Sequence, residues 1–225
     1  MEIQRVYDLF IRGFRRRRMR AFARTFDPRA STCILDVGGT PYNWQLLDSN
    51  PRVTLLNLEL PVGADVLPPQ LVAVVGDATR LEFEDRSFEV GFSNSLIEHL
   101  GTWERQSAFA NEIRRVSRGL WVQTPARSFP AEPHLLALFV HYLPLSWQRR
   151  LVRRFTLWGW ISRPSQERID RFLHETRLLS YADMRELFPG CAIRRERFLG
   201  LTKAYIAVRA CSAADARPTT ARRSC

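Results

Sequence analysis

The chain has 225 residues, of which 45% are hydrophobic and 25% are charged. This composition excludes disordered and fibrous classes and indicates a folded protein with its own core. The net charge is +11, and Lys203 is the only lysine among the 34 basic residues. Such an excess of arginine favours nucleic acid, an anionic membrane surface or an anionic substrate as partner, although a coding bias toward arginine gives the same composition.

Apolar residues recur at helical spacing through residues 2–26, which predicts an amphipathic helix. Arg15 to Arg18 form a basic run on this helix. Two interpretations are open: the helix covers the domain edge with solvated arginines, or it contacts a membrane or a polyanion. We assign residues 1–30 to this N-terminal basic helix.

Short apolar runs then alternate with a helical stretch. The predicted strands are Cys33–Val37, Val53–Leu58, Leu71–Val75, Phe88–Phe92 and Leu120–Val122, and the helix is Trp103–Val116. A helix at Tyr181–Phe188 precedes two final strands, Cys191–Phe198 and Lys203–Arg209. Strands that alternate with helices form parallel sheets. We therefore predict an α/β fold: a Rossmann-like, doubly wound, seven-stranded, mostly parallel sheet that ends in an antiparallel hairpin.

Residues 126–180 interrupt this alternation with prolines and a dense set of aromatic residues, which predicts a helical cap inserted into a main domain over residues 31–210. Within the cap, Trp147–Trp160 mixes arginines with tryptophans, a composition typical of an anionic interface and also of a cap with solvated arginines. Residues 211–225 lack periodicity and are predicted to be disordered.

No segment of the sequence predicts secretion, a membrane span or a metal site. The first residues mix acids and bases ahead of any apolar run, unlike a secretory signal. Histidines and a proline interrupt the longest uncharged stretch of the middle region, whereas a membrane helix needs about 20 mainly apolar residues. The four cysteines form no CxxC pair. We therefore predict a cytoplasmic protein without a metal, in contact with membranes at their surface at most.

Two acidic strand ends and a glycine pair form the first candidate site. Asp36 lies near the end of a buried strand and is followed by Gly38 and Gly39, which let the backbone turn sharply and approach a ligand closely. Glu59 closes the next strand about 20 residues later, where a carboxylate accepts hydrogen bonds from a ribose diol. A plain turn and a surface acid remain the alternatives, but together the residues favour a nucleotide-like ligand.

An ordered set of motifs over Val74–Leu100 narrows the choice among nucleotide-binding families. Its members are Gly76, Asp77 and Ala78, an acidic segment from Leu81 to Glu89, then Ser93 and Asn94, and finally Glu98 and His99. With these motifs the sequence resembles, over Ile34–Thr124, the class I S-adenosylmethionine-dependent methyltransferases, in particular the methyltransferase type 11 group.

That resemblance implies S-adenosylmethionine as cofactor and methyl transfer as activity. It implies that Asp36, Gly38 and Gly39 flank the methionine part, that Glu59 holds the ribose, that Asp77 and Ala78 contact the adenine, and that Asn94 and Ser95 line the methionine side. The family usually carries a further glycine in the first loop, where this chain has Thr40, Pro41 and Tyr42. A non-catalytic binding module is therefore an alternative.

The acceptor and the catalytic base are predicted from general chemistry. Transfer to oxygen or nitrogen benefits from a general base, and histidine is the usual choice. His99 and His134 are the catalytic candidates, ahead of His141 and His174. We expect a small-molecule, lipid-linked or bacterial envelope-glycan acceptor. RNA methylation is an alternative, but Asn94 is followed by Ser-Leu-Ile rather than by an Asn-Pro-Pro-aromatic tetrad, which argues against nucleic acid.

Overall fold

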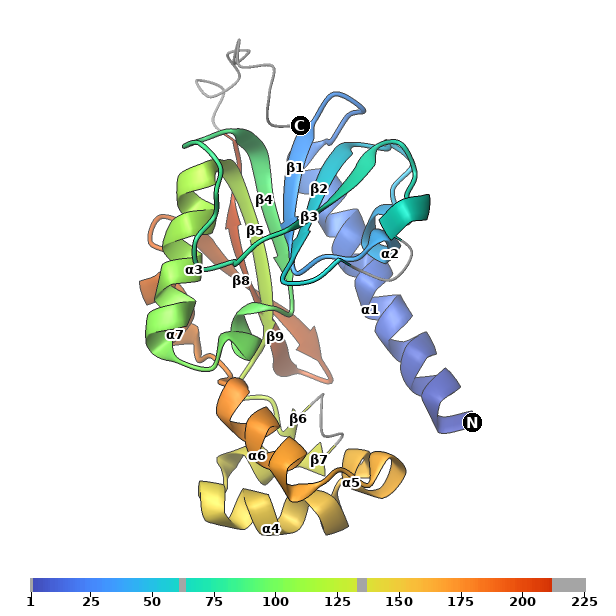
Figure 1. Cartoon of the computed structure of the whole chain (residues 1–225), viewed down its shortest axis with the longest axis vertical. Coiled ribbons are helices and arrows are strands. Elements are labelled where there is room, and N and C mark those ends of the chain that lie inside the picture. The colour runs from blue at the N-terminus through green and yellow to red at the C-terminus, as the bar shows by residue number, and fades with distance from the viewer. Residues whose placement is uncertain (1, 61–63, 133–136, 212–225) are drawn as a thin grey trace. The chain divides into compact units, whose positions relative to one another are not determined.

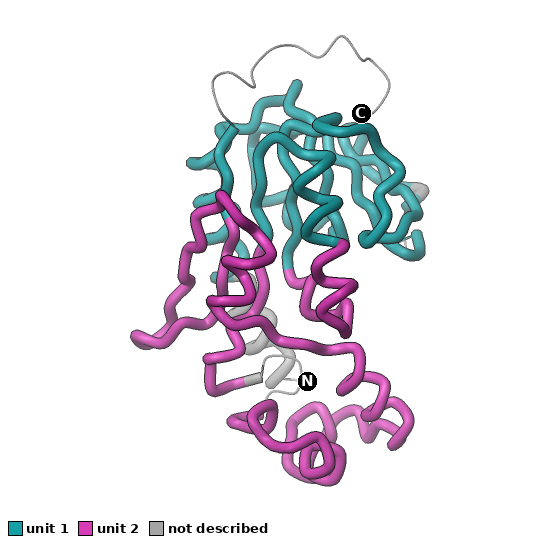
Figure 2. The backbone as a smooth tube through the Cα atoms, turned by 90° about the vertical axis from the view of Figure 1, so that its left-hand side faces the viewer, with its two compact units in different colours: residues 1–94, 109–122, 208–225 teal, residues 95–108, 123–207 magenta. Residues whose placement is uncertain are grey.

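The computed structural model of the chain describes residues 2–60, 64–132 and 137–211. It contains two compact units (Figure 2). Unit 1 comprises residues 1–94, 109–122 and 208–225, and unit 2 comprises residues 95–108 and 123–207. The main sheet has seven strands in the order β3-β2-β1-β4-β5-β9-β8, which confirms the predicted Rossmann-like arrangement.

Runs of five to nine residues form the strands of this sheet, and all of them except the charged β8 are mainly apolar. They are β1 (Cys33–Val37), β2 (Arg52–Asn57), β3 (Leu71–Val75), β4 (Phe88–Asn94), β5 (Ser117–Pro125), β8 (Ala192–Phe198) and β9 (Leu201–Arg209). β1 pairs in parallel with β2 and β4, and β2 pairs in parallel with β3. Because these four strands run in one direction, their carboxyl ends lie at the same edge of the sheet (Figure 1). β8 and β9 form the predicted closing hairpin through a turn at Leu199 and Gly200.

Two long helices, α1 (Glu2–Phe26) and α3 (Trp103–Val116), cover opposite faces of the sheet. Consecutive residues of a strand point to opposite faces. On β4, the ring of Phe92 packs edge-on against Phe22 of α1, with their centroids 5.2 Å apart. A Cβ on the preceding Gly91 would lie only 2.9 Å from Ile113 of α3. The two helices therefore enclose β4 between them, as a doubly wound fold requires.

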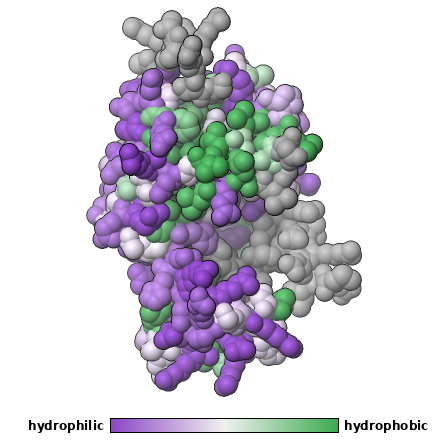
Figure 3. All heavy atoms as spheres, viewed as in Figure 1, coloured by the Kyte–Doolittle hydropathy of each residue, from purple (hydrophilic) through white to green (hydrophobic). Residues whose placement is uncertain are grey.

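The connections between β1 and β4 are short and carry little helix. The link from β1 to β2 holds only α2 (Pro41–Trp44), and the link from β2 to β3 holds η1 (Ala64–Val66). The described residues 76–87, which join β3 to β4, contain no helix. Val72 and Val75 of β3 are accordingly 53% and 61% exposed. Apolar residues gather on this face of the surface, over β2 and β3 (Figure 3).

Unit 2 contains a cluster of helices between β5 and β9. These elements are β6 (Ala131–Glu132), β7 (Ala137–Leu138), η3 (Val140–Tyr142), α4 (Leu145–Phe155), α5 (Leu157–Ser162), α6 (Gln166–Glu175) and α7 (Tyr181–Leu187), and unit 2 also contains η2 (Ile97–Leu100) ahead of α3. Val152 of α4 and Ile169 of α6 form the centre of a small core, against which Trp158 of α5 packs. A parallel bridge between Ala126 and Leu179 joins the two ends of this segment.

Within the described part of the chain, none of the helices combines the length and the apolar character that crossing a membrane requires.

Candidate cofactor site

The glycine loop after β1 is held tightly against the end of β2. Gly38 has a φ of 75°, a conformation that glycine adopts without strain, and its N–H donates to the carbonyl of Leu56 at 2.8 Å. The Asn57 side-chain amide donates to the carbonyl of Gly39 at 3.0 Å. A Cβ on Gly39 would lie 2.0 Å from a carboxylate oxygen of Asp36. Only glycine fits at position 39 while Asp36 keeps this place.

Asp36 lies beneath that loop and is completely buried. Its Oδ2 accepts a hydrogen bond from the indole of Trp44 at 2.8 Å. Its Oδ1 has no hydrogen-bond partner among the described residues. Burial raises the pKa of Asp36 from 3.8 to about 7, and the Trp44 hydrogen bond opposes that rise. A buried carboxylate with one unpaired oxygen favours a positively charged group nearby.

Glu59 and Asp77 follow neighbouring strands at the same level. β2 ends at Asn57, so Glu59 lies two residues beyond the strand, whereas the sequence predicted that it closes the strand. Asn57 pairs with Val75 of β3. Glu59 and Asp77 each lie two residues beyond that pair, and the N–H of Gly76 donates to the carbonyl of Asn57 at 2.9 Å. The two carboxylates therefore share one edge of the sheet.

These two acids differ in their surroundings. The side chain of Glu59 is exposed, between the equally exposed Leu58 and Leu60. Oδ1 of Asp77 accepts hydrogen bonds from the N–H and the hydroxyl of Thr79, both at 2.8 Å. Ala78 is buried at 7% exposure. Asp77 thus braces its own turn, whereas Glu59 extends toward solvent.

Asn94 ends β4 and contacts the N-terminal helix. Its side-chain oxygen accepts a hydrogen bond from the guanidinium of Arg18 on α1. Arg18 is only 8% exposed, and Met19 and Phe22 next to it are also buried. A charged side chain is buried in this way only when it is paired. The edge that carries Asp36 and Glu59 therefore also carries a buried cation.

Sequence reasoning missed Arg18 because it treated Arg15 to Arg18 as one solvated run. The spacing of residues along the helix could have indicated that Arg18 is buried. Phe14, Arg18 and Phe22 are four residues apart, so all three lie on one face of the helix. An arginine on the apolar face of a helix is a candidate for a buried, paired role.

Ser95 follows Asn94 and belongs to unit 2. Its φ is 60°, which is uncommon for a residue other than glycine. Its N–H donates to the carbonyl of Gln123 at 3.0 Å, and its hydroxyl donates to the Gln123 side chain at 3.1 Å. Two hydrogen bonds to β5 therefore hold the residue in this conformation.

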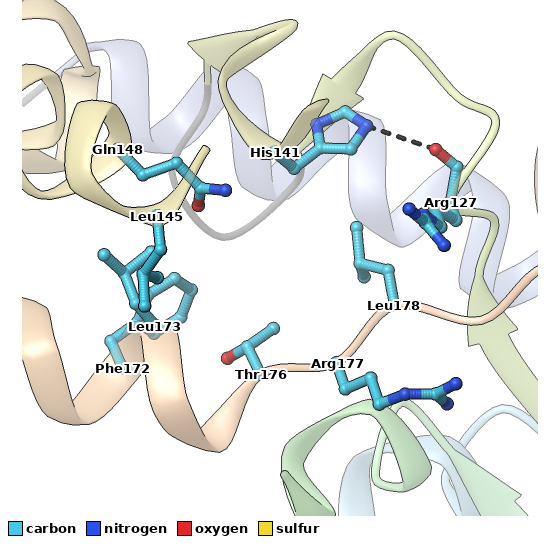
Figure 4. A pocket seen from close by; sticks show the side chains of 9 residues that line it. All are labelled: Arg127, His141, Leu145, Gln148, Phe172, Leu173, Thr176, Arg177 and Leu178. Atoms are coloured by element: carbon cyan, nitrogen blue, oxygen red, sulfur yellow. Dashed lines mark hydrogen bonds between the residues drawn. The ribbon is translucent and has the colours of Figure 1, made fainter. Parts of the chain in front are cut away.

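The candidate catalytic histidines do not lie together in one site. His99 lies exposed on η2, and His134 falls outside the described residues. His141 lines a pocket of about 280 Å³ in unit 2, where its Nε2 lies 3.2 Å from the carbonyl oxygen of Arg127. Figure 4 shows His141 and Arg127 on one wall of this pocket, with Thr176 and Arg177 opposite them. His99 does not line it.

Leucines and one phenylalanine make up the apolar part of the pocket: Leu145, Phe172, Leu173 and Leu178. Arg177 is fixed at its border, since its guanidinium donates to Gln106 at 2.5 Å and lies over the ring of Trp103 at 4.9 Å. The hydroxyl oxygen of Thr176 is buried and makes no hydrogen bond within the described part of the chain.

Part of the chain matches a known family of domains. Residues 47–119 match a family whose description is "Methyltransferase domain". No curated protein matches the chain.

Solved structures share the architecture at low sequence identity. The chain is 14% identical to the Burkholderia thailandensis 1,6-didemethyltoxoflavin-N1-methyltransferase, which was solved with S-adenosylhomocysteine, and the match covers 89% of this chain and 79% of that one at a TM-score of 0.54. It is 16% identical to the N-terminal domain of EvdMO1 with S-adenosylhomocysteine bound, covering 88% and 81% at a TM-score of 0.53.

A third match is more partial. The chain is 18% identical to the [4+2]-cyclase SpnF over 52% of its own length, spans 47% of that protein, and reaches a TM-score of 0.44. The seven-stranded sheet and the matched domain agree on the fold. The chain therefore has the fold of the class I S-adenosylmethionine-dependent methyltransferases, and residues 47–119 match the methyltransferase domain.

Proposed function

We propose that the protein transfers a methyl group from S-adenosylmethionine to a small-molecule, lipid-linked or envelope-glycan acceptor, at oxygen or nitrogen. One observation carries the cofactor assignment. The carboxyl ends of β1 to β4 bring Gly38, Glu59, Asp77 and Asn94 to one edge of the sheet, in aligned register. Ligands of open α/β sheets bind at this edge.

The charges at this edge complement those of S-adenosylmethionine, which carries a sulfonium, an ammonium, a carboxylate and a ribose diol. The carboxylate of Asp36, buried beneath the glycine loop with one unpaired oxygen, suits the ammonium end of the methionine part through its charge rather than by direct contact. The exposed carboxylate of Glu59 suits the diol. Arg18, which is held beside Asn94, suits the carboxylate of the cofactor. The set of side chains therefore fits both ends of the molecule.

The first loop lacks the further glycine of the family, and the structure shows what stands in its place. Where the family usually has a further glycine, Pro41 begins the short helix α2, and Trp44 at its end bonds to Asp36. Proline suits the first turn of a helix because its missing N–H would be unpaired there. A short helix anchored on Asp36 therefore stands at the position of that glycine, which supports retained cofactor binding.

We propose the pocket of unit 2 as the acceptor site. Its leucines and Phe172 suit an apolar body, while Arg127 and the unpartnered hydroxyl of Thr176 suit an anionic or hydroxyl group on the same molecule. If Nε2 of His141 donates to the carbonyl of Arg127, its Nδ1 is the basic nitrogen that accepts a proton. His141 thereby joins His99 and His134 as a candidate base.

Titration calorimetry with the pure protein tests the cofactor assignment. We expect S-adenosylmethionine to bind with a Kd in the range of roughly 1 μM to 1 mM. Glu59→Ala should weaken binding at least tenfold, because hydrogen bonds to a charged group contribute about 1.5–3 kcal/mol each. Glu84→Ala, at another exposed glutamate of unit 1, is the matched control and should bind as the wild type does. Absence of binding to the wild type would refute the proposal.

A further inference from the structure

Helices α4 and α5 expose an unusual set of large apolar side chains. Trp147 is 60% exposed, Phe155 70%, Trp160 70% and Ile161 60%. Single exposed apolar residues are common on soluble proteins, but neighbouring exposed aromatic residues mark interaction sites. Together with Arg150 and Arg154, which are also exposed, we call these residues the cap surface.

The residues of the cap surface lie on one side of α4, at its last residue Phe155, and in the second half of α5. At 100° per residue, Trp147, Arg150 and Arg154 lie on the side of α4 opposite the fully buried Val152. The indole N–H of Trp160 donates to the carbonyl of Arg154 at 2.6 Å, which holds α5 against the end of α4. The ring of Trp147 and two guanidinium groups therefore share one exposed face of α4, next to the exposed residues of α5.

The cap surface belongs to a packed element. The other side of α4 contributes Val152 to the core that it shares with Ile169 of α6. Arg149 of α4 donates two hydrogen bonds of 2.6 Å to Asp170 of α6. The chain's own core thus uses one face of the amphipathic helix and leaves the opposite face for a partner.

The charge of the segment identifies that partner. Residues 145–163 contain five arginines and no aspartate or glutamate. A second copy of the chain would present the same positive charge and be repelled. Surfaces that expose arginines together with tryptophan, phenylalanine or leucine suit anionic membrane surfaces, because the guanidinium groups attract the lipid headgroups and tryptophan favours the interface. We infer that the cap surface docks on the headgroups of an anionic lipid bilayer.

Structure separates this surface from the other basic helix. In the described side chains of α1, residues 13–26, Arg18, Met19 and Phe22 are buried in the core of unit 1, so the apolar face of this half of the helix is already occupied. From sequence, both Arg15 to Arg18 and Trp147–Trp160 were candidates for contact with a membrane. We therefore assign this contact to α4 and α5.

Vesicle sedimentation of the full-length protein tests the inference. We expect binding to phosphatidylcholine vesicles that contain about a third phosphatidylglycerol, and a decline of that binding between low and high salt. Pure phosphatidylcholine vesicles should bind at least tenfold more weakly. Equal binding to both vesicle types, or binding to neither, would overturn the inference.

Paired variants locate the contact. Arg150→Gln with Arg154→Gln, and separately Phe155→Ser with Ile161→Ser, should each lower the partition coefficient by roughly tenfold or more. The control is Arg24→Gln with Arg185→Gln, which removes the same charge from exposed positions on α1 and α7 and should lower binding less than threefold. An equal loss in the control would mean that net charge, and not this surface, causes the binding.

A measurement on the wild type stands even if a variant fails to fold. Vesicles with brominated acyl chains should quench tryptophan fluorescence, and Trp147→Phe with Trp160→Phe should remove most of that quenching. Absent quenching contradicts docking on the bilayer. Salt-sensitive retention of RNA without vesicle binding, or a dimer that Phe155→Ser dissociates, would assign the surface to RNA or to a second copy instead.

Discussion

Helices α1 and α4 have similar compositions but opposite uses. Each carries four arginines close together, and each mixes them with aromatic residues. In α1 the face with Phe22 packs onto Phe92 and Trp121 of the sheet, with ring centroids 5.2 and 5.7 Å away. In α4 only Val152 is fully buried, and Trp147 remains exposed. The comparison teaches that a basic amphipathic pattern specifies a helix with two faces, whereas the surrounding fold decides what each face meets.

The largest difference is expected in stability. Phe22→Ala should lower the free energy of unfolding by about 3–5 kcal/mol, because a fully buried aromatic ring is replaced by a cavity. Phe155→Ala should change it by less than about 0.5 kcal/mol, because that ring is 70% exposed. Urea unfolding of both variants measures the two values. Similar losses would mean that α4 is packed as tightly as α1.

The pH dependence sharpens the comparison, because each helix lies near an acid with a shifted pKa. The pKa of Asp36, whose partner Trp44 packs on Phe22, is raised to about 7 by burial. Folding therefore favours the protonated form, and the stability that this proton contributes is complete below about pH 4 and is lost as the pH rises through about 7. Between pH 4 and pH 8 the wild type should lose on the order of 2–4 kcal/mol relative to Asp36→Asn.

Asp170 supplies the opposite sign in the same experiment. Its hydrogen bonds from Arg149 of α4 lower its pKa, so its contribution to stability is lost as the pH falls. Unfolding of Asp36→Asn, Asp170→Asn and wild type across this pH range measures both effects. A pH-independent difference between Asp36→Asn and the wild type would show that Asp36 keeps an ordinary pKa.

The third prediction concerns binding and has the smallest effect. Arg18→Gln should weaken S-adenosylmethionine binding by about tenfold, because it removes a charge-assisted pair with the cofactor's carboxylate. Methylthioadenosine, which lacks the amino-acid part, should bind the variant and the wild type equally. Arg17→Gln, at the exposed neighbouring position, is the control. Calorimetry with both ligands measures the ratio, and equal weakening for both ligands would mean that Arg18 only supports the fold.

The parallel part of the sheet could be predicted from sequence because its strands are short apolar runs with clear ends. Cys33–Val37, Leu71–Val75 and the helix Trp103–Val116 match the observed bounds of β1, β3 and α3. The predicted β4 stopped at Phe92, whereas the strand continues to Asn94, because Ser93 is buried and donates to the carbonyl of Val37 on the neighbouring strand. Such a contact depends on strand pairing, which local hydrophobicity does not encode.

The candidate site was only partly accessible to the same reasoning. Gly38, Glu59 and Asp77 follow strands and are found by their spacing, and the structure places them at one edge. Arg18 lies 76 residues from Asn94, so only tertiary packing joins them. The short hairpin of β6 and β7 was also missed, because two-residue strands have no periodicity to detect.

The close approach of position 39 to Asp36 restricts how this protein can evolve. Because a Cβ at that position would overlap the carboxylate at 2.0 Å, replacement of the glycine is compatible only with a smaller residue at position 36 or a displaced loop. Trp44 would then lose its acceptor. The residues at positions 36, 39 and 44 therefore depend on one another. In related sequences we expect these three positions to change together or to remain unchanged.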